Sequence, residues 1–244
     1  MNYLPENNSR YKHVEYWDDR YRAEETYDWF GSFCKFRYLL ENHIKKEDCI
    51  LVLGCGNSSM SGDMYSAGYR SITNIDYSSV CIHAMSARHK DCPGMTWHEM
   101  DMQELSFPDA SFDVIIEKGT LDAITVEEKS PWNLSSQTAA TIHKALTEVS
   151  RCLKPGGRLV SITFASPFIR KRLYTHTDYS WSIKTYSYDG GFEYYMYVMT
   201  KGEKLSSEDA ALEKQQTERN ETPPDIVTLP EDKTADDFLS RIDL

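Results

Sequence analysis

The chain has 244 residues, of which 27 are Lys or Arg and 38 are Asp or Glu, so its formal net charge is −11. This acidic balance argues against general nucleic-acid binding, which needs basic surface to displace counterions, and no run approaches the ~18 apolar residues of a membrane span. With 40% hydrophobic residues, the chain has enough apolar side chains for a sizeable core. We therefore expect a globular protein that binds neither nucleic acid nor membrane.

The six cysteines are scattered along the chain and form no Cys-x-x-Cys pair. Several lie in apolar runs, where a free thiol behaves as a small hydrophobe. This pattern predicts a reducing compartment, with neither a metal site nor a disulfide framework. The first 20 residues contain no apolar signal segment, so we expect a cytoplasmic protein. We also expect a monomer.

The N-terminal part of the chain is rich in aromatic side chains. They are Tyr11, Tyr16, Trp17, Tyr21, Tyr27, Trp29 and Phe30. A short helix over residues 15–22 would place Tyr16 or Trp17 on the same face as Tyr21. Two interpretations follow: the rings pack on the domain, or they form a lid over a ligand. Taken alone, the residues favour packing, because aromatic side chains commonly fill cores.

Predicted helices and strands alternate through the centre of the chain. Helices are predicted at 33–44, 58–67, from Ser78 or Ser79 onward, and at 138–153; strands are predicted at 50–53, 71–77, 95–100, 112–119 and 158–164. Two further strands, 181–188 and 192–200, flank Asp189-Gly190-Gly191 and predict a hairpin. The alternation predicts an α/β fold: a doubly wound, mostly parallel seven-stranded sheet with a C-terminal antiparallel hairpin.

The first predicted strand ends in Gly54-Cys55-Gly56. Glycines at such a turn allow a ligand to approach the main chain, although glycine after a strand is often only a turn. Asp76 closes the second strand, 22 residues after Gly54, where a carboxylate can accept hydrogen bonds from a ribose diol or simply cap a helix. Asp101 and Met102 end the third strand and suit an adenine ring, unless Asp101 is an ordinary loop residue. Together these residues predict one nucleoside crevice.

The type of nucleotide follows from what is missing in the pattern. A dinucleotide fingerprint needs a third glycine where this chain has Ser59, and no Gly-Lys-Ser/Thr phosphate loop is present. S-adenosylmethionine fits better, because it carries an adenine and a ribose but no phosphate. We therefore expect S-adenosylmethionine as the cofactor and S-adenosylhomocysteine as its product.

From Ile50 to Lys201 the chain resembles the class I S-adenosylmethionine-dependent methyltransferases, although Val52 and Ser58 depart from their general pattern. Four segments extend the resemblance to the lysine methyltransferases of translation elongation factor 1-alpha. They are Glu15-Tyr16-Trp17-Asp18-x-Arg20-Tyr21, Tyr27-Asp28-Trp29-Phe30, Leu51-Val52-Leu53-Gly54-Cys55-Gly56-Asn57-Ser58 and Glu117-Lys118-Gly119-Thr120-Leu121-Asp122-Ala123. The resemblance implies a protein-lysine N-methyltransferase whose partner is elongation factor 1-alpha.

The resemblance also implies roles for particular residues. It places the aromatic residues Trp17, Tyr21 and Trp29 in the cofactor pocket, which reverses the preference for simple packing. The other implied cofactor contacts are Gly54, Gly56, Asp76, Tyr77, Asp101, Met102 and Lys118. The segment needed for transfer comprises Glu117, Lys118, Gly119, Thr120, Leu121 and Asp122. Within it, our hypothesis is that Glu117, Thr120 and Asp122 receive and orient the substrate amine.

We expect the chain to divide into three regions. Residues 1–48 form an aromatic lid and a leading helix, and residues 49–202 form the methyltransferase core. Residues 203–244 carry twelve acidic and five basic side chains and form a largely flexible tail, which ends in a short helix over Phe238–Leu244. Two alternatives to lysine transfer remain open: a small-molecule methyltransferase, or a non-catalytic module that binds the cofactor.

Overall fold

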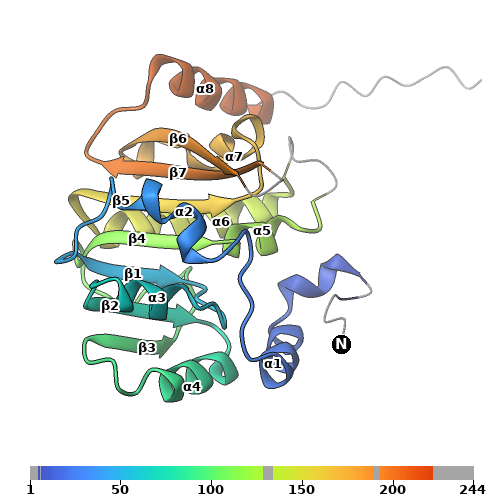
Figure 1. Cartoon of the computed structure of the whole chain (residues 1–244). Helices are drawn as coiled ribbons and strands as arrows, with labels where there is room; N and C mark the ends of the chain where they lie inside the picture. The colour runs from blue at the N-terminus through green and yellow to red at the C-terminus, as the bar shows by residue number, and fades with distance from the viewer. Residues whose placement is uncertain (1–4, 6, 129–133, 190–192, 222–244) are drawn as a thin grey trace, which may run out of the picture.

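The computed structural model describes residue 5 and residues 7–128, 134–189 and 193–221. In this part of the chain, seven strands form one sheet in the order β3-β2-β1-β4-β5-β7-β6 (Figure 1). Their bounds are Cys49–Leu53 (β1), Ser71–Asp76 (β2), Met95–Glu99 (β3), Phe112–Lys118 (β4), Leu153–Thr163 (β5), Trp181–Asp189 (β6) and Glu193–Lys201 (β7). Strands β1 to β5 pair in parallel, whereas β7 runs antiparallel to β5 and β6. The predicted fold class is confirmed.

The helices connect these strands and continue beyond them. Their bounds are Val14–Ala23 (α1), Phe33–Leu40 (α2), Met60–Ser66 (α3), Ser79–Arg88 (α4), Thr120–Thr125 (α5), Ser136–Cys152 (α6), Pro167–Tyr174 (α7) and Ser207–Glu221 (α8), with 3-10 turns at Asn8–Lys12 (η1) and Thr177–Tyr179 (η2). Helix α4 begins as expected, because the Ser78 side chain accepts from the Cys81 backbone N–H. Helices α5, α7 and α8 were not predicted from the sequence. Helix α5 has only six residues, too few to show a helical period.

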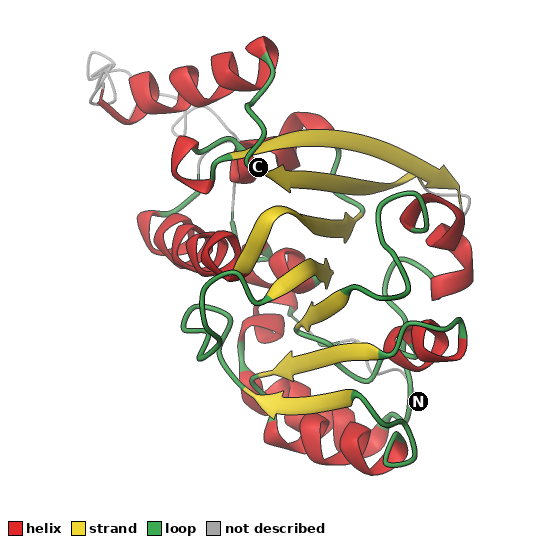
Figure 2. Cartoon of the chain, turned by 90° about the vertical axis from the view of Figure 1, so that its left-hand side faces the viewer, coloured by secondary structure: helices red, strands yellow, loops and turns green. Residues whose placement is uncertain are grey.

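The sheet is buried on both faces (Figure 2). Strand β1 shows how: Ile50 and Val52 pack in the layer with α2, α3 and α4, whereas Leu51 and Leu53 pack in the layer with α5, α6 and α7. All four side chains are at most 2% exposed. A strand buried on both faces reads as a continuous apolar run rather than as an alternating pattern, which is why Ile50–Leu53 was recognisable from the sequence.

The strand order changes direction at β1. This strand pairs with β2 on one side and with β4 on the other, so the chain leaves β1 toward one half of the sheet and returns to the other half. Parallel sheets open a crevice at the carboxyl ends of the strands at such a switch point, because the connecting helices diverge there. The turn after Leu53 therefore lies at the bottom of the crevice.

Helix α8 lies in the region that the sequence analysis treats as a largely flexible tail. Its first turn is held to the domain: Asp209 is 1% exposed and pairs with Lys171 of α7 at 2.8 Å. Glu213 also accepts the Thr177 backbone N–H, at 2.6 Å. The predicted terminal helix over Phe238–Leu244 lies outside the described residues. Among the helices that the structure describes, none has the length and apolarity to cross a membrane.

Candidate active site

The turn after β1 depends on two glycines. Gly54 and Gly56 have φ values of +57° and +51°, in the left-handed region that favours glycine. A Cβ on Gly54 would lie 2.7 Å from the Thr120 methyl carbon, and a Cβ on Gly56 would lie 3.0 Å from the Tyr21 hydroxyl oxygen. Both glycines therefore keep bare backbone along the floor of the crevice. The Thr120 hydroxyl, which donates to the Leu53 carbonyl at 3.0 Å, fixes α5 against this turn.

Asp76 lies beside the turn and is only 3% exposed. Its carboxylate accepts the backbone N–H groups of Gly56 and Ser78, each at 3.0 Å. Burial raises the pKa of this carboxyl to about 6. Each oxygen uses one lone pair on the backbone and keeps another for a ligand, so Asp76 both shapes the turn and remains able to accept from a ribose.

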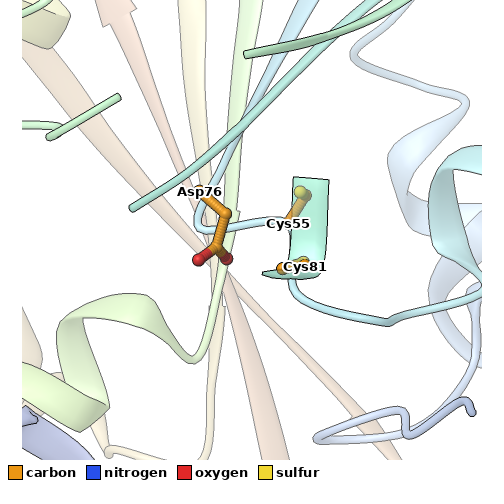
Figure 3. Close-up of side chains that lie close together, drawn as sticks. All are labelled: Cys55, Asp76 and Cys81. Atoms are coloured by element: carbon orange, nitrogen blue, oxygen red, sulfur yellow. The ribbon is translucent and has the colours of Figure 1, made fainter. Parts of the chain in front are cut away.

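Two cysteines lie close to Asp76. Figure 3 shows the side chains of Cys55, Asp76 and Cys81 close together. One possible ligand atom from each lies within 4.8 Å of the others. Burial raises the pKa of the Cys55 thiol well above its ordinary value, which favours the protonated form, whereas metals bind the thiolate. We therefore interpret the two thiols as packing groups behind the glycine turn.

Asp101 and Met102 lie on the same crevice, at the end of β3. Both line the cavity together with Asp76 and Tyr77. Met102 is 9% exposed, and the Asp101 carboxylate accepts the Gln103 backbone N–H at 2.8 Å. The structure thus shows Asp101 in the loop role that the residues alone left open: its second oxygen accepts from the Gln103 side chain at 3.2 Å, and the residue borders the same crevice as the glycine turn.

The N-terminal aromatic side chains pack on one another and line the cavity at the same time. Trp17, Tyr21 and Trp29 all border it, and the rings of Trp17 and Tyr21 stack at 5.7 Å between centroids. Arg20 is 5% exposed and lies within 5.8 Å of the rings of Trp17, Tyr27 and Trp29. A cation over aromatic faces stiffens such a cluster, so this segment forms a wall of the cavity.

Asp28 fastens the aromatic wall to the glycine turn. It accepts from the Ser58 hydroxyl and, at 2.8 Å, from the Ser59 hydroxyl. Lys118 of β4 lies 3.4 Å from the same carboxylate and donates to the Trp29 carbonyl at 2.8 Å. Burial lowers the pKa of Lys118, while Asp28 opposes that shift. The geometry therefore supports a wall-fastening role for Lys118, whereas its predicted contact with the cofactor stays a prediction.

We expect Asp28→Ala to weaken S-adenosylmethionine binding by about tenfold, because three polar contacts that hold the aromatic wall are lost. Calorimetric titration measures the affinity, and limited proteolysis reports whether the N-terminal segment has loosened. Asp19→Ala is the matched control, since the exposed pair of Asp19 with Arg22 lies on the same segment. Equal affinities of Asp28→Ala and the unaltered protein would contradict the fastening role.

The segment 117–122, at the end of β4 and the start of α5, divides into a buried part and a part that borders the cavity. Lys118, Gly119, Thr120 and Asp122 line the cavity. Leu121 is fully buried in the core. Glu117 is 1% exposed; its carboxylate accepts from the Ser161 hydroxyl and from the backbone N–H groups of Thr120 and Leu121, at 3.2 and 3.3 Å. The carboxylate therefore caps the N-terminus of α5 from the buried side of the helix. The hypothesis that Glu117 contacts the substrate amine directly does not fit this geometry.

The burial of Glu117 makes stability depend on pH. Burial raises its pKa from 4.5 to about 7, so its contribution to stability is present below pH 4.5 and is lost as the pH rises through about 7. Glu117→Gln removes this titration. The unaltered protein loses this contribution as the pH rises, whereas the variant does not. The free energy of unfolding of the variant minus that of the unaltered protein should therefore increase by on the order of 3 kcal/mol from about pH 5 to about pH 8. Urea unfolding at both pH values measures the difference, and a constant offset would refute the assignment.

Asp122 lies where the cavity continues past the glycine turn. One of its oxygens, Oδ1, accepts from the Thr163 hydroxyl at 2.7 Å and from Arg170 of α7. The other, Oδ2, is buried and has no hydrogen-bond partner among the described residues. The sequence analysis did not single out Arg170, which is 2% exposed. Its helix is short, and Arg170 begins the basic run Arg170-Lys171-Arg172, which by itself indicates only a solvated face.

The cavity is large and extends beyond the glycine turn to helix α7. Its volume is about 1060 Å³, at the upper end of the roughly 300–1,000 Å³ that enclose one drug-sized ligand. One end is lined by the glycine turn, Asp76 and the aromatic wall. The other end, which we call the acceptor end, is bordered by Asp122, Phe164, Ile169 and Leu173. The bare backbone at Gly54 and Gly56 and the carboxylate of Asp76 fit S-adenosylmethionine at the first end.

Solved structures share this fold. The N-methyltransferase NodS from Bradyrhizobium japonicum WM9, in complex with S-adenosyl-L-homocysteine, has a TM-score of 0.58 at 16% identity, over 81% of this chain and 100% of that one. A SAM-dependent methyltransferase from Methanosarcina mazei has a TM-score of 0.51 at 18% identity, over 67% of this chain and 96% of that one. Residues 51–161 also match a family model described as a methyltransferase domain. The chain therefore contains a methyltransferase domain and has the fold of S-adenosylmethionine-dependent methyltransferases.

Closer relatives share almost the whole chain. The EEF1A lysine methyltransferase 4 of Mus musculus is 45% identical over 99% of this chain and 95% of its own length, and that of Bos taurus is 43% identical over the same shares. The human eEF1A lysine and N-terminal methyltransferase is 37% identical over 72% of this chain but only 25% of its own length. The chain belongs to the family of the EEF1A lysine methyltransferases.

Proposed function

We propose that this methyltransferase transfers the methyl group of S-adenosylmethionine to a lysine of translation elongation factor 1-alpha. The observation that carries the proposal is the 45% identity to the mouse enzyme over 99% of the chain, which includes the acceptor end as well as the cofactor crevice. We further propose that the protein acts as a monomer in the cytoplasm. In this proposal residues 1–48 supply the lid, and residues 49–202 form the catalytic core.

The cofactor end holds and orients the methyl donor. Asp76 would accept from the ribose hydroxyls, while Asp101 and Met102 border the adenine. The backbone at Gly54 and Gly56 would approach the rest of the molecule, because no Cβ intervenes there. Trp17, Tyr21, Trp29 and Tyr77 complete the walls. When bound, S-adenosylmethionine supplies a methyl group on a positively charged sulfur.

The acceptor end has to present lysine as a nucleophile. Free lysine has a pKa near 10.4, so its neutral amine at pH 7 lies roughly 4.6 kcal/mol above the ammonium. Apolar walls such as Phe164, Ile169 and Leu173 disfavour the charged form by desolvation. The amine nitrogen then forms the N–C bond as the C–S electron pair returns to sulfur, and the additional proton leaves the product amine to solvent. Asp122 and Thr120 would receive and aim this amine, so that it lies in line with the methyl group.

Transfer to a purified acceptor and to a lysate tests the proposal. The full chain is incubated with labelled S-adenosylmethionine and with elongation factor 1-alpha produced in bacteria, and calorimetry measures cofactor binding in parallel. We expect cofactor binding and labelled lysine in the factor, and a single labelled protein of the same size in a eukaryotic lysate. Label confined to the small-molecule fraction would favour a small-molecule acceptor instead. Binding without any transfer would leave a non-catalytic module.

A further inference from the structure

Arg170 and Asp122 form a buried ion pair at the acceptor end. The two side chains are 2% and 10% exposed, and both residues border the cavity. Arg170 Nη2 donates to Asp122 Oδ1 and, at 2.9 Å, to the Thr163 hydroxyl. Removing two charges from water is costly unless they are paired, so each residue requires the other. The pair joins α7 to α5 across the end of β5.

The pair leaves polar atoms unused. Asp122 Oδ2, Arg170 Nε and Arg170 Nη1 are buried, and none has a hydrogen-bond partner among the described residues. Buried polar atoms without partners are uncommon in folded proteins and call for an explanation. Because the carboxylate is held through Oδ1 alone, the buried Oδ2 keeps its capacity to accept a hydrogen bond, in a residue that borders the cavity. A substrate that enters the acceptor end with an N–H group would satisfy it.

The charge of Arg170 addresses a difficulty with a carboxylate at this place. A lone carboxylate stabilises a nearby ammonium and raises its pKa, whereas methyl transfer needs the neutral amine. A guanidinium bonded to the same carboxylate offsets its charge but leaves its oxygen free to accept. The pair therefore presents a hydrogen-bond acceptor with little net charge.

We propose that Arg170 is a positioning residue that holds Asp122 with Oδ2 toward the acceptor end and, by offsetting its charge, allows the substrate lysine to bind as the neutral amine. The inference rests on the proposed lysine transfer and adds to it the device that selects the protonation state of the acceptor. Arg170 acts through Asp122 and makes no contact with the reacting atoms in this proposal.

Other ionisable groups face Arg170 and have to be separated from this effect. They are Asp122 from α5, Glu117 from β4, Tyr174 from α7 itself and Tyr197 from β7. Burial raises the pKa of both tyrosines above the ordinary value, so they stay neutral near pH 7. Glu117 has a pKa raised to about 7 by burial and would titrate within the assay range. All variants of the test therefore carry Glu117→Gln.

The test is the pH dependence of single-turnover methyl transfer to bacterially produced elongation factor 1-alpha, at saturating S-adenosylmethionine, from about pH 6 to about pH 10. The rate rises with pH as the bound amine loses its proton, and the midpoint is the measured quantity. We expect Arg170→Met to move the midpoint upward by about one pH unit, with a rate about tenfold lower at pH 7. Asp122→Asn should move it downward. Arg170→Lys keeps the positive charge and should leave the midpoint near that of the protein that carries only Glu117→Gln.

The controls keep the outcome decisive. Lys171→Met alters the neighbouring residue of α7, which pairs with Asp209, and should not move the midpoint. An unmoved midpoint in Arg170→Met, or a downward one, overturns the proposal. If circular dichroism shows that Arg170→Met is unfolded, Asp122→Asn decides, and an unmoved midpoint there overturns the proposal as well. Absence of transfer by the unaltered protein would refute the proposed function itself, which is a distinguishable result.

Discussion

Asp76→Ala is expected to weaken S-adenosylmethionine binding by at least about 100-fold. Hydrogen bonds to a charged group contribute roughly 1.5–3 kcal/mol each, and two ribose hydroxyls would lose their acceptor. The same carboxylate also accepts the backbone N–H groups of Gly56 and Ser78, so the glycine turn loses its support. Calorimetric titration measures the affinity. Asp91→Ala, at an exposed position between α4 and β3, is the matched control.

A deoxy analogue separates direct contact from distortion of the turn. S-adenosylhomocysteine without its 2′-hydroxyl should bind the unaltered protein more weakly than S-adenosylhomocysteine does. Asp76→Ala should bind both compounds equally, because the partner of that hydroxyl is gone. An equal penalty for the missing hydroxyl in both proteins would mean that Asp76 acts only through the backbone of the turn.

Asp122→Ala is expected to lower the free energy of unfolding by about 3–5 kcal/mol, because it leaves Arg170 as a buried charge without its carboxylate. Replacing both partners, in Asp122→Leu with Arg170→Met, should restore most of that stability, since an apolar pair of similar size needs no counter-charge. Methyl transfer should be lost in both proteins, while calorimetry should find cofactor affinity nearly unchanged. Urea unfolding and transfer to elongation factor 1-alpha provide the two measurements.

The comparison of the single and double variants separates stability from transfer. A double variant that regains both stability and transfer would show that Asp122 has no part in receiving the amine. A loss of stability below about 1 kcal/mol in Asp122→Ala would mean that another carboxylate compensates Arg170. Glu117 is the nearest candidate, because it also faces that guanidinium. Repeating the unfolding experiment with Glu117→Gln added would then reveal this compensation.

The sheet and the cofactor crevice were largely predictable, because they depend on local patterns. Strand β1 is an apolar run, and Gly54 and Gly56 follow it at once. Asp76 follows at the distance that one strand-helix-strand unit requires, so its place at the neighbouring carboxyl end could be inferred. The structure describes each of these residues at the crevice. Whether they bind the cofactor as expected stays a prediction.

The role of the N-terminal segment could not be predicted from its own residues alone, because it depends on contacts with distant parts of the chain. Taken alone, its aromatic residues favour packing over a lid. The structure combines packing with a place at the cavity, because a ring can pack on one side and border a cavity on the other. Asp28 lies in a segment that supported the family resemblance, but its function as a fastener depends on Ser58, Ser59 and Lys118. Those partners are distant in sequence and become neighbours only through the fold.

By itself the sequence determined the class of fold, the cofactor crevice and the family, since strand periodicity, glycine turns and strand-end carboxylates are properties of short segments. Only the tertiary structure decided which acidic residue of the segment 117–122 borders the acceptor end. Glu117 and Asp122 are equally acidic in the sequence, yet Glu117 caps α5 from the core, whereas Asp122 meets Arg170 beside the cavity. The physical reason is that the role of a carboxylate depends on its burial and its partners. The side chains that distinguish these two carboxylates are Ser161 for Glu117 and Thr163 and Arg170 for Asp122, which lie 41 to 48 residues away along the chain.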